Sequence, residues 1–323
     1  MKIRDLIYKL VLLCLAVSLW PLHSCNSFRE YLPECRLYVQ FSYDHNMLSA
    51  DVFHKQVDKV ELYIFDTDGI FLFKQTDEGA LLAREDYRME VFIPTGRYRF
   101  IVWAGAHDSY EIASLIPGTS DIEELKLKLK RSQNLIIDKE LEPLWYGEIT
   151  DVDFTGRTTQ TEVVSLIKDT NKLRFVFQGQ TPAWTINVDD YSYQILESNG
   201  YLNYDNSLLS DDILSYEPYH TKQESAQAAA VELNTMRLMA DRQTRFVVTH
   251  KATGNVVFDI DLVYFLRLTE MEMYNTWDEQ EYFDRKDEYV IVFFFSEQSD
   301  PDGPWVAVRV NINTWTWYFQ TEG

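Results

Sequence analysis

The sequence predicts a mainly β protein made of two tandem antiparallel β-sandwich domains with one or two short helices. Apolar and polar residues alternate over most of the chain, which is the pattern of strands with one buried face. Turns rich in glycine, aspartate and asparagine separate these runs. With 46% hydrophobic residues, including 20 Tyr and 19 Phe, the chain can bury a large core. Many short strands joined by turns favour sandwiches over alternating strand–helix units.

The first half of the chain contains six strand patterns. The turn Asp66–Gly69 joins two of them as a hairpin, and Pro94-Thr95-Gly96 predicts a second hairpin between two others. Leu125–Lys130 contains good helix formers, but its period of two predicts a strand. The expected strands are Leu37–Ser42, Val60–Ile64, Ile70–Phe73, Arg88–Ile93, Tyr98–Trp103 and Leu125–Lys130.

The second half repeats this style. Gly254 lies in the loop of an expected hairpin, and the apolar run Tyr289–Phe295 is typical of a central strand. Ser225–Ala240 has the best helical composition, and Glu270–Tyr282 is a weaker helix candidate. The expected strands are Lys172–Phe177, Phe246–Thr249, Val256–Ile260, Tyr289–Phe295, Val306–Ile312 and Trp315–Phe319.

The N-terminus has the pattern of a bacterial lipoprotein signal at residues 1–24. A basic start precedes Leu10–Leu22, an apolar run too short to span a bilayer. Leu22-His23-Ser24-Cys25 then resembles a lipobox, which implies cleavage before Cys25 and acylation of its thiol, for example with palmitate. An ordinary secretory signal is the alternative. Cys14 leaves with the signal, so the remaining Cys35 has no disulfide partner in the lipidated chain.

The mature chain has a length that suits two domains. The polar stretch Asp151–Thr161 separates two strand-rich blocks, so we expect an N-terminal domain at residues 25–158 and a C-terminal domain at residues 159–323. Without residues 1–24 the chain carries 27 basic and 50 acidic side chains, a net charge of −23. Such a chain repels phosphate backbones, which excludes nucleic acid as an expected partner.

No catalytic motif stands out, and we expect no enzyme, cofactor, metal or small-molecule substrate. The five mature histidines are scattered along the sequence. Asp66 and Asp68 begin like a calcium loop but lack the distant Glu, so turn formation explains them better; Asp151 and Asp153 are weaker cation candidates. A hydrolase would need two close carboxylates in a cleft.

Tryptophans could serve as stacking platforms for a glycan. The candidates are Trp103, Trp145, Trp277 and Trp305, although core packing is the ordinary role of such residues in a sandwich. This reading leads to the alternative function, a surface glycan-binding lipoprotein of a polysaccharide uptake system.

Several segments closely resemble the FimB-type fimbrial anchor subunits of Bacteroides-like bacteria. The resemblance covers nearly the whole mature chain, and its first block is the most specific. The matching segments are Cys35–Met47, Ala50–Phe53, Val57–Asp66, Ile93–Tyr98, Trp103–Gly105, Asp169–Arg174 and Thr253–Phe258.

The resemblance implies a cell-adhesion role at the base of a fimbrium. Members are outer-membrane lipoproteins at the cell surface, with two transthyretin-like sandwich domains in tandem, and they are not enzymes. They hold the polymer of fimbrial stalk subunits on the cell. Cys25 matches the lipidated position of the family.

The C-terminal segment is a candidate partner strand. Trp315, Trp317 and Phe319 alternate with polar residues close to the chain end. An added strand gains affinity from main-chain hydrogen bonds and specificity from alternate side chains. In the family, subunits are thought to join by strand exchange. The same pattern also fits the last strand of the chain's own sandwich, so the sequence leaves both readings open.

Overall fold

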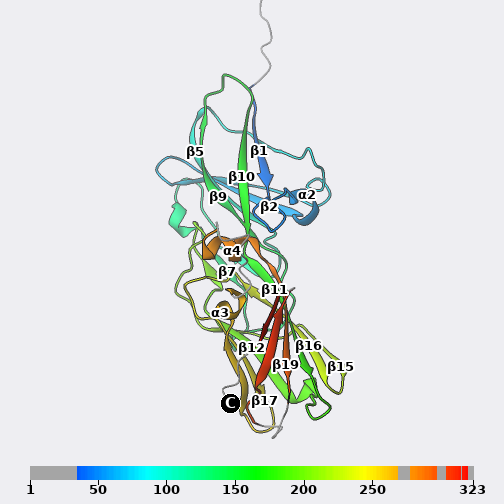
Figure 1. The fold of residues 1–323 in the computed structure, drawn as a ribbon. Coiled ribbons are helices and arrows are strands. Elements are labelled where there is room, and N and C mark those ends of the chain that lie inside the picture. Colours follow the sequence, from blue (N-terminus) through cyan, green and yellow to red (C-terminus); the bar gives the residue numbers. More distant parts are fainter. Residues whose placement is uncertain (1–34, 268–276, 297–302, 314, 319–323) are drawn as a thin grey trace, which may run out of the picture. The chain divides into compact units, whose positions relative to one another are not determined.

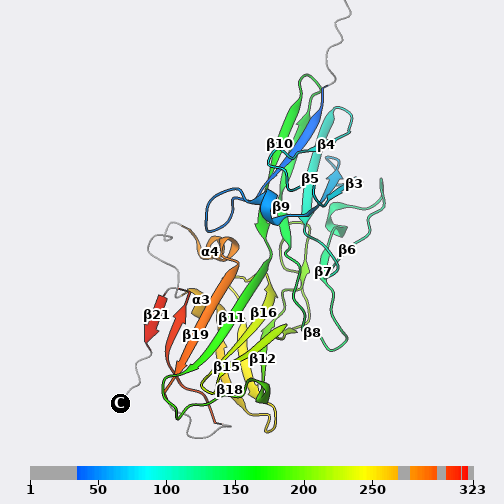
Figure 2. The same cartoon turned by 90° about the vertical axis from the view of Figure 1, so that its right-hand side faces the viewer.

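The computed structural model describes residues 35–267, 277–296, 303–313 and 315–318, which are mostly β-strand (Figures 1 and 2). The strands form sheets of seven, six, five and three members. This confirms the mainly β fold class that the alternation predicts. No helix in these residues is long and apolar enough to cross a membrane.

The seven-stranded sheet is built from strands between residues 37 and 168. Its two edge strands, β3 (Phe71–Glu78) and β4 (Met89–Val91), lie close to each other. The side-chain amide of Gln75 in β3 donates to the carbonyl of Glu90 in β4 at 3.0 Å. The rings of Phe41, Tyr87 and Phe53 stack on one another, and Phe53 is the first residue of the short helix α2 (Phe53–Gln56). In order across the sheet, the strands are β3, β2 (Lys59–Phe65), β5 (Gly96–Ala104), β9 (Trp145–Phe154), β10 (Gln160–Lys168), β1 (Leu37–Ser42) and β4.

The six-stranded sheet carries the end of the chain. Its central strands β11 and β19 run parallel to each other, unlike its other neighbouring pairs. In order, the strands are β15 (His220–Ser225), β16 (Ala228–Met236), β11 (Thr170–Gly179), β19 (Glu288–Phe295), β20 (Ala307–Ile312) and β21 (Trp315–Tyr318).

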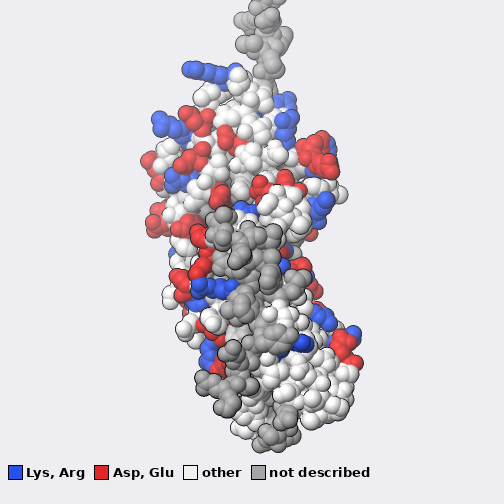
Figure 3. All heavy atoms as spheres, viewed as in Figure 1, with Lys and Arg blue, Asp and Glu red and all other residues white. Residues whose placement is uncertain are grey.

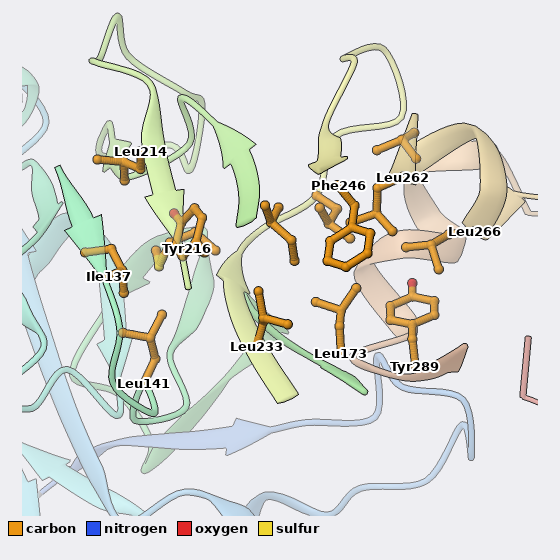
Figure 4. Packing of buried hydrophobic residues seen from close by; sticks show 14 of the residues in the cluster. Ile137, Leu141, Leu173, Leu214, Tyr216, Leu233, Phe246, Leu262, Leu266 and Tyr289 are labelled. Atoms are coloured by element: carbon orange, nitrogen blue, oxygen red, sulfur yellow. The ribbon is translucent and has the colours of Figure 1, made fainter. Parts of the chain in front are cut away.

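The five-stranded sheet packs against the six-stranded one. Phe175 and Phe246 stack between them with ring centroids 3.9 Å apart, and Figure 4 shows Leu173 and Tyr289 in the same apolar layer. The helix α3 (Leu262–Arg267) adds Leu262 and Leu266 to this core. The strands are β18 (Val256–Asp261), β17 (Arg245–His250), β12 (Tyr191–Glu197), β14 (Leu214–Tyr216) and β8 (Ile136–Ile137).

Elements from the two halves of the chain pair with each other. β8 joins the five-stranded sheet, and the three-stranded sheet combines β13 (Tyr201–Leu202) with β7 (Leu127–Leu129) and β6 (Tyr110–Ile112). One cluster of buried apolar residues extends from Tyr63 to Ile312. The remaining helices are the 3-10 turns η2 (Ile122–Glu124) and η3 (Val188–Asp190) and the helix α4 (Glu279–Arg285).

The expected domain division at residue 158 stays a prediction. The strands on either side of it, β9 and β10, pair antiparallel within the seven-stranded sheet. The chain passes from that sheet into the six-stranded sheet at Asp169, between β10 and β11.

The helix expected at Ser225–Ala240 is wrong. Ala228–Met236 forms the strand β16, which lies between β15 and β11 and is buried at almost every position. Helix propensity is a weak preference that tertiary pairing readily overrides. The second helix candidate overlaps α4, and its residues 270–276 lie outside the described residues.

The hairpin expected across Pro94-Thr95-Gly96 is also wrong. Both strands form, but β4 pairs with β1, whereas β5 lies between β2 and β9. Alternation specifies which face of a strand is buried but not which strand is its neighbour. The hairpins β2–β3 and β17–β18 are confirmed, as is the central position of β19.

Candidate partner-binding edge

The C-terminal strand β21 lies at the edge of the six-stranded sheet as far as the chain is described. It pairs antiparallel with β20, so that Trp315 faces Ile312 and Trp317 faces Val310 across the ladder. An edge strand directs alternate backbone N–H and C=O groups away from its sheet, where another chain can pair with them. Phe319, the third residue of the candidate partner strand, lies outside the described residues.

A tight turn holds the β20–β21 hairpin on β19. Asn313 adopts a positive φ of 52° in this turn, and its N–H donates to the carbonyl of Val290 at 2.7 Å. Its side-chain oxygen accepts from the N–H of Val290 at 2.9 Å. β20 therefore has firm support on its β19 side. β21 has only a four-residue ladder with β20, and so short a ladder adds little stability by itself.

The outer face of the same sheet mixes apolar and charged side chains. Figure 3 shows charged side chains of both signs over much of the visible surface and few of them at the lower right. Val290 is exposed, and Arg174, opposite it in the register, pairs with Glu232. Phe294 is half-buried, and the guanidinium of Arg309 lies 3.7 Å from its ring centroid. The backbone edge of β21 therefore remains the candidate contact with another chain.

The acidic cation candidates serve the local structure. The Asp66 carboxylate accepts from the N–H groups of Asp68 and Ile70, each at 2.9 Å, which is the hydrogen bonding of a turn. Asp66, Asp151 and Asp153 do line one pocket of about 280 Å³, together with Arg97 and Arg99. Arg99 pairs with Asp151 at 2.8 Å, and positive charge in the pocket opposes a cation. Within the described ranges, no three His, Cys, Asp or Glu side chains are placed to hold a metal.

A groove that the sequence did not reveal lies over β2 and β3. It has a volume of about 740 Å³, and the segment 106–117 forms its other wall. Three of its charged groups pair with one another: Glu61 lies 2.7 Å from Lys74 and 3.8 Å from Lys59, whose ammonium also donates to the carbonyl of Ala106. The groove is also lined by Glu78, His107 and Asp108.

Three of the four candidate stacking tryptophans belong to the core. Trp103, Trp145 and Trp305 are buried, which confirms the core-packing reading for them. Trp305 makes edge contacts with Trp184 and Tyr191 at centroid distances of 5.8 and 4.8 Å. Trp277 is half-buried, and the guanidinium of Arg285 lies 4.7 Å from its ring centroid. The guanidinium of Arg285 thus covers one face of the Trp277 ring.

Replacing Trp305 with alanine is expected to lower the free energy of unfolding by about 3–5 kcal/mol, because the substitution leaves a cavity in the aromatic core. The matched change Trp277→Ala is expected to cost less than about 2 kcal/mol, since that side chain is half-buried. Equilibrium unfolding in urea measures both values. A Trp305→Ala protein of unchanged stability would contradict the core assignment.

Similarity to known proteins shows to which family the chain is related. A family model described as fimbrillin-A associated anchor proteins Mfa1 and Mfa2 matches residues 32–321. The minor fimbrium anchoring subunit Mfa2 of Porphyromonas gingivalis is 23% identical over 331 residues, covering 98% of this chain and 95% of Mfa2.

Solved structures agree with this comparison in fold. A Bacteroides thetaiotaomicron protein provisionally described as polysaccharide-binding superposes with a TM-score of 0.84 at 52% identity, covering 90% of this chain and 99% of the other. The Mfa2 anchor protein of Porphyromonas gingivalis superposes with a TM-score of 0.70 at 20% identity, covering 88% and 99%.

Proposed function

The chain belongs to the family of fimbrillin-associated anchor proteins that includes Mfa2, and from this membership we infer that it anchors a fimbrium at the cell surface. The family match over residues 32–321 is the observation that carries this conclusion. It spans both strand-rich halves of the chain, so the inference does not depend on one shared module.

The proposed mechanism of attachment is strand addition with a fimbrial stalk subunit, and the C-terminal segment containing Trp315, Trp317 and Phe319 is the proposed donor. Two features support it. β21 is an outermost strand with a short ladder, and it pairs only with β20 among the described residues. A strand that forms more main-chain hydrogen bonds in a partner's sheet than it gives up in its own sheet can be donated at a modest cost in free energy.

Attachment to the outer membrane is proposed to use lipid at Cys25. The Leu22-His23-Ser24-Cys25 sequence after a short apolar run supports this assignment. A donor at the C-terminus suits a chain that is tied to the membrane at its N-terminus, because the two functions then use opposite ends of the sequence. The role requires no catalysis, cofactor or small-molecule substrate.

A glycan-binding function is the second candidate. The description of the 52% identical Bacteroides thetaiotaomicron protein as provisionally polysaccharide-binding favours it. Against it, the burial of Trp103, Trp145 and Trp305 removes the aromatic platforms that the sequence offered. The family match therefore weighs more than this description.

Co-purification from native outer membranes tests the proposal. The full-length, lipidated protein, solubilised in mild detergent, is expected to bring down a fimbrial stalk subunit in a fixed ratio. An untagged strain controls for non-specific adsorption. Retention of a polysaccharide without any fimbrial subunit would support the second candidate and contradict the first.

A further inference from the structure

A buried polar pair lies where the chain passes from β10 to β11. Asp169 is 0% exposed, and its backbone N–H donates to the carbonyl of Leu144 at 2.8 Å. Asn206 is 3% exposed and lies in the tight turn after β13, with a positive φ of 64°. Its side-chain nitrogen Nδ2 donates to Asp169 Oδ1 at 2.9 Å. The pair thus joins the link between two sheets to a turn of the second half of the chain.

Each member of the pair has one oxygen without a hydrogen-bond partner in the described structure. These are Oδ2 of Asp169 and Oδ1 of Asn206, and both are buried. Two acceptors cannot satisfy each other without a hydrogen between them. An unpaired buried acceptor is destabilising, more so when it belongs to an ionised carboxylate.

The neighbouring charges do not supply the missing donor. Arg237 gives two hydrogen bonds to Asp284, at 2.7 and 2.5 Å, and a third to the backbone carbonyl of Asn206 at 3.3 Å. Asp284 opposes the effect of Arg237 on Asp169. Two buried phenols, Tyr110 of β6 and Tyr146 of β9, are further ionisable groups close enough to interact with Asp169.

We propose that Asp169 carries a proton in the folded protein and donates it from Oδ2 to Oδ1 of Asn206. The acid and the amide then form a ring closed by two hydrogen bonds, and one proton satisfies both unpaired oxygens. Burial independently favours the neutral acid, because it raises the pKa of Asp169 to about 7, and the charge of Arg237 only partly offsets this effect.

The pair makes the joint between β10 and β11 sensitive to pH. The folded-state pKa of about 7 lies above the ordinary value of 3.8, so the folded protein holds a proton that the unfolded chain has lost between these two values. The stabilising effect is complete below the unfolded pKa. It decreases as the pH rises through the folded pKa, and above that value the ring opens. The pair therefore stabilises the joint in acid and no longer does so above about pH 7.

The variant Asp169→Asn tests this inference. Its amide keeps the shape of the acid and can donate to Asn206 Oδ1 at every pH. Relative to this variant, the unfolding equilibrium constant of the wild-type protein is expected to rise about tenfold for each pH unit between about 5 and 6.5. Urea unfolding of the mature protein at a series of pH values measures the ratio. A ratio that stays constant over this range would overturn the proposal.

A matched variant and a direct probe complete the test. Asp211→Asn breaks the buried ion pair between Arg131 and Asp211, neither of which acts on the pKa of Asp169, and is expected to destabilise the protein at every pH. Infrared difference spectra of aspartate-labelled wild-type protein are expected to show a protonated carboxyl band at pH 6 that disappears near pH 8. The band must be absent from Asp169→Asn and present in Asp211→Asn. If wild-type protein shows no such band at pH 6, Asp169 is ionised and the inference fails, whether or not either variant folds.

Discussion

A disulfide that locks β21 onto β20 is expected to abolish capture of a fimbrial stalk subunit while it is oxidised and to restore capture when it is reduced. Asn311 and Thr316 face each other in the ladder. Opposed residues of an antiparallel pair have Cα atoms about 4.5–5.5 Å apart, within the range that a disulfide bridges. The double variant Asn311→Cys, Thr316→Cys can therefore link β21 covalently to β20 without moving the backbone.

The experiment separates donation of β21 from its retention. Binding of purified stalk subunit to the mature protein, with and without reductant, gives the measurement. Cys35 is changed to Ser in all samples, because it is the free cysteine of the described chain. Each single cysteine variant controls for the substitutions themselves. Equal binding in the oxidised and reduced states would mean that β21 stays in its own sheet, and donation would be wrong.

Replacing Cys25 with serine is expected to move nearly all of the protein from the outer membrane to the soluble fraction. Only the thiol can carry the proposed lipid, and no helix among the described residues could replace it as an anchor. The fold should be unchanged, because the described fold begins after this position. Fractionation of cells, followed by circular dichroism of the released protein, measures both points.

The conservative control for this change is Cys35→Ser, which leaves the proposed lipidation site intact and should remain membrane-bound. Cells with Cys25→Ser are also expected to shed their fimbriae into the medium. A Cys25→Ser protein that stays in the outer membrane after a high-salt wash would exclude lipid at Cys25 as the anchor.

Much of the fold was predictable because each strand carries its own signal. The alternation around Val60–Ile64 and the glycine turn at Gly254 specify hairpins through residues close together in sequence. The pairing of β4 with β1, more than 40 residues away, depends on which faces meet after collapse. No local pattern reports that choice. β16 shows the same limit, because its alanines suit a helix and also fit a buried strand inside a sheet.

The candidate site also has a part that the sequence predicts and a part that only the complete fold shows. Trp315 and Trp317 could be assigned to an extended C-terminal segment from their spacing, and the structure places them in β21. Their position at a sheet edge required the order of six strands. The Asp169–Asn206 pair had no sequence signal. The two residues are 37 positions apart in the sequence. Their contact affects stability because both are buried, and burial depends on the complete fold.

The parallel pairing of β1 with β10, and of β11 with β19, has a mechanical consequence for a chain pulled at both ends, as the proposed lipid at Cys25 and the proposed C-terminal donor strand would pull it. Tension enters at the start of β1 and leaves through the end of β10, so the six registered pairs from Leu37–Gln160 to Ser42–Ser165 are loaded in shear and resist together. The eight pairs from Lys172–Glu288 to Gly179–Phe295 carry the same kind of load. β21 is antiparallel to β20, and force on its C-terminal end opens the ladder one pair at a time, beginning at Tyr318. Under such tension we expect the terminal strand β21 to separate from β20 before the parallel pairs separate.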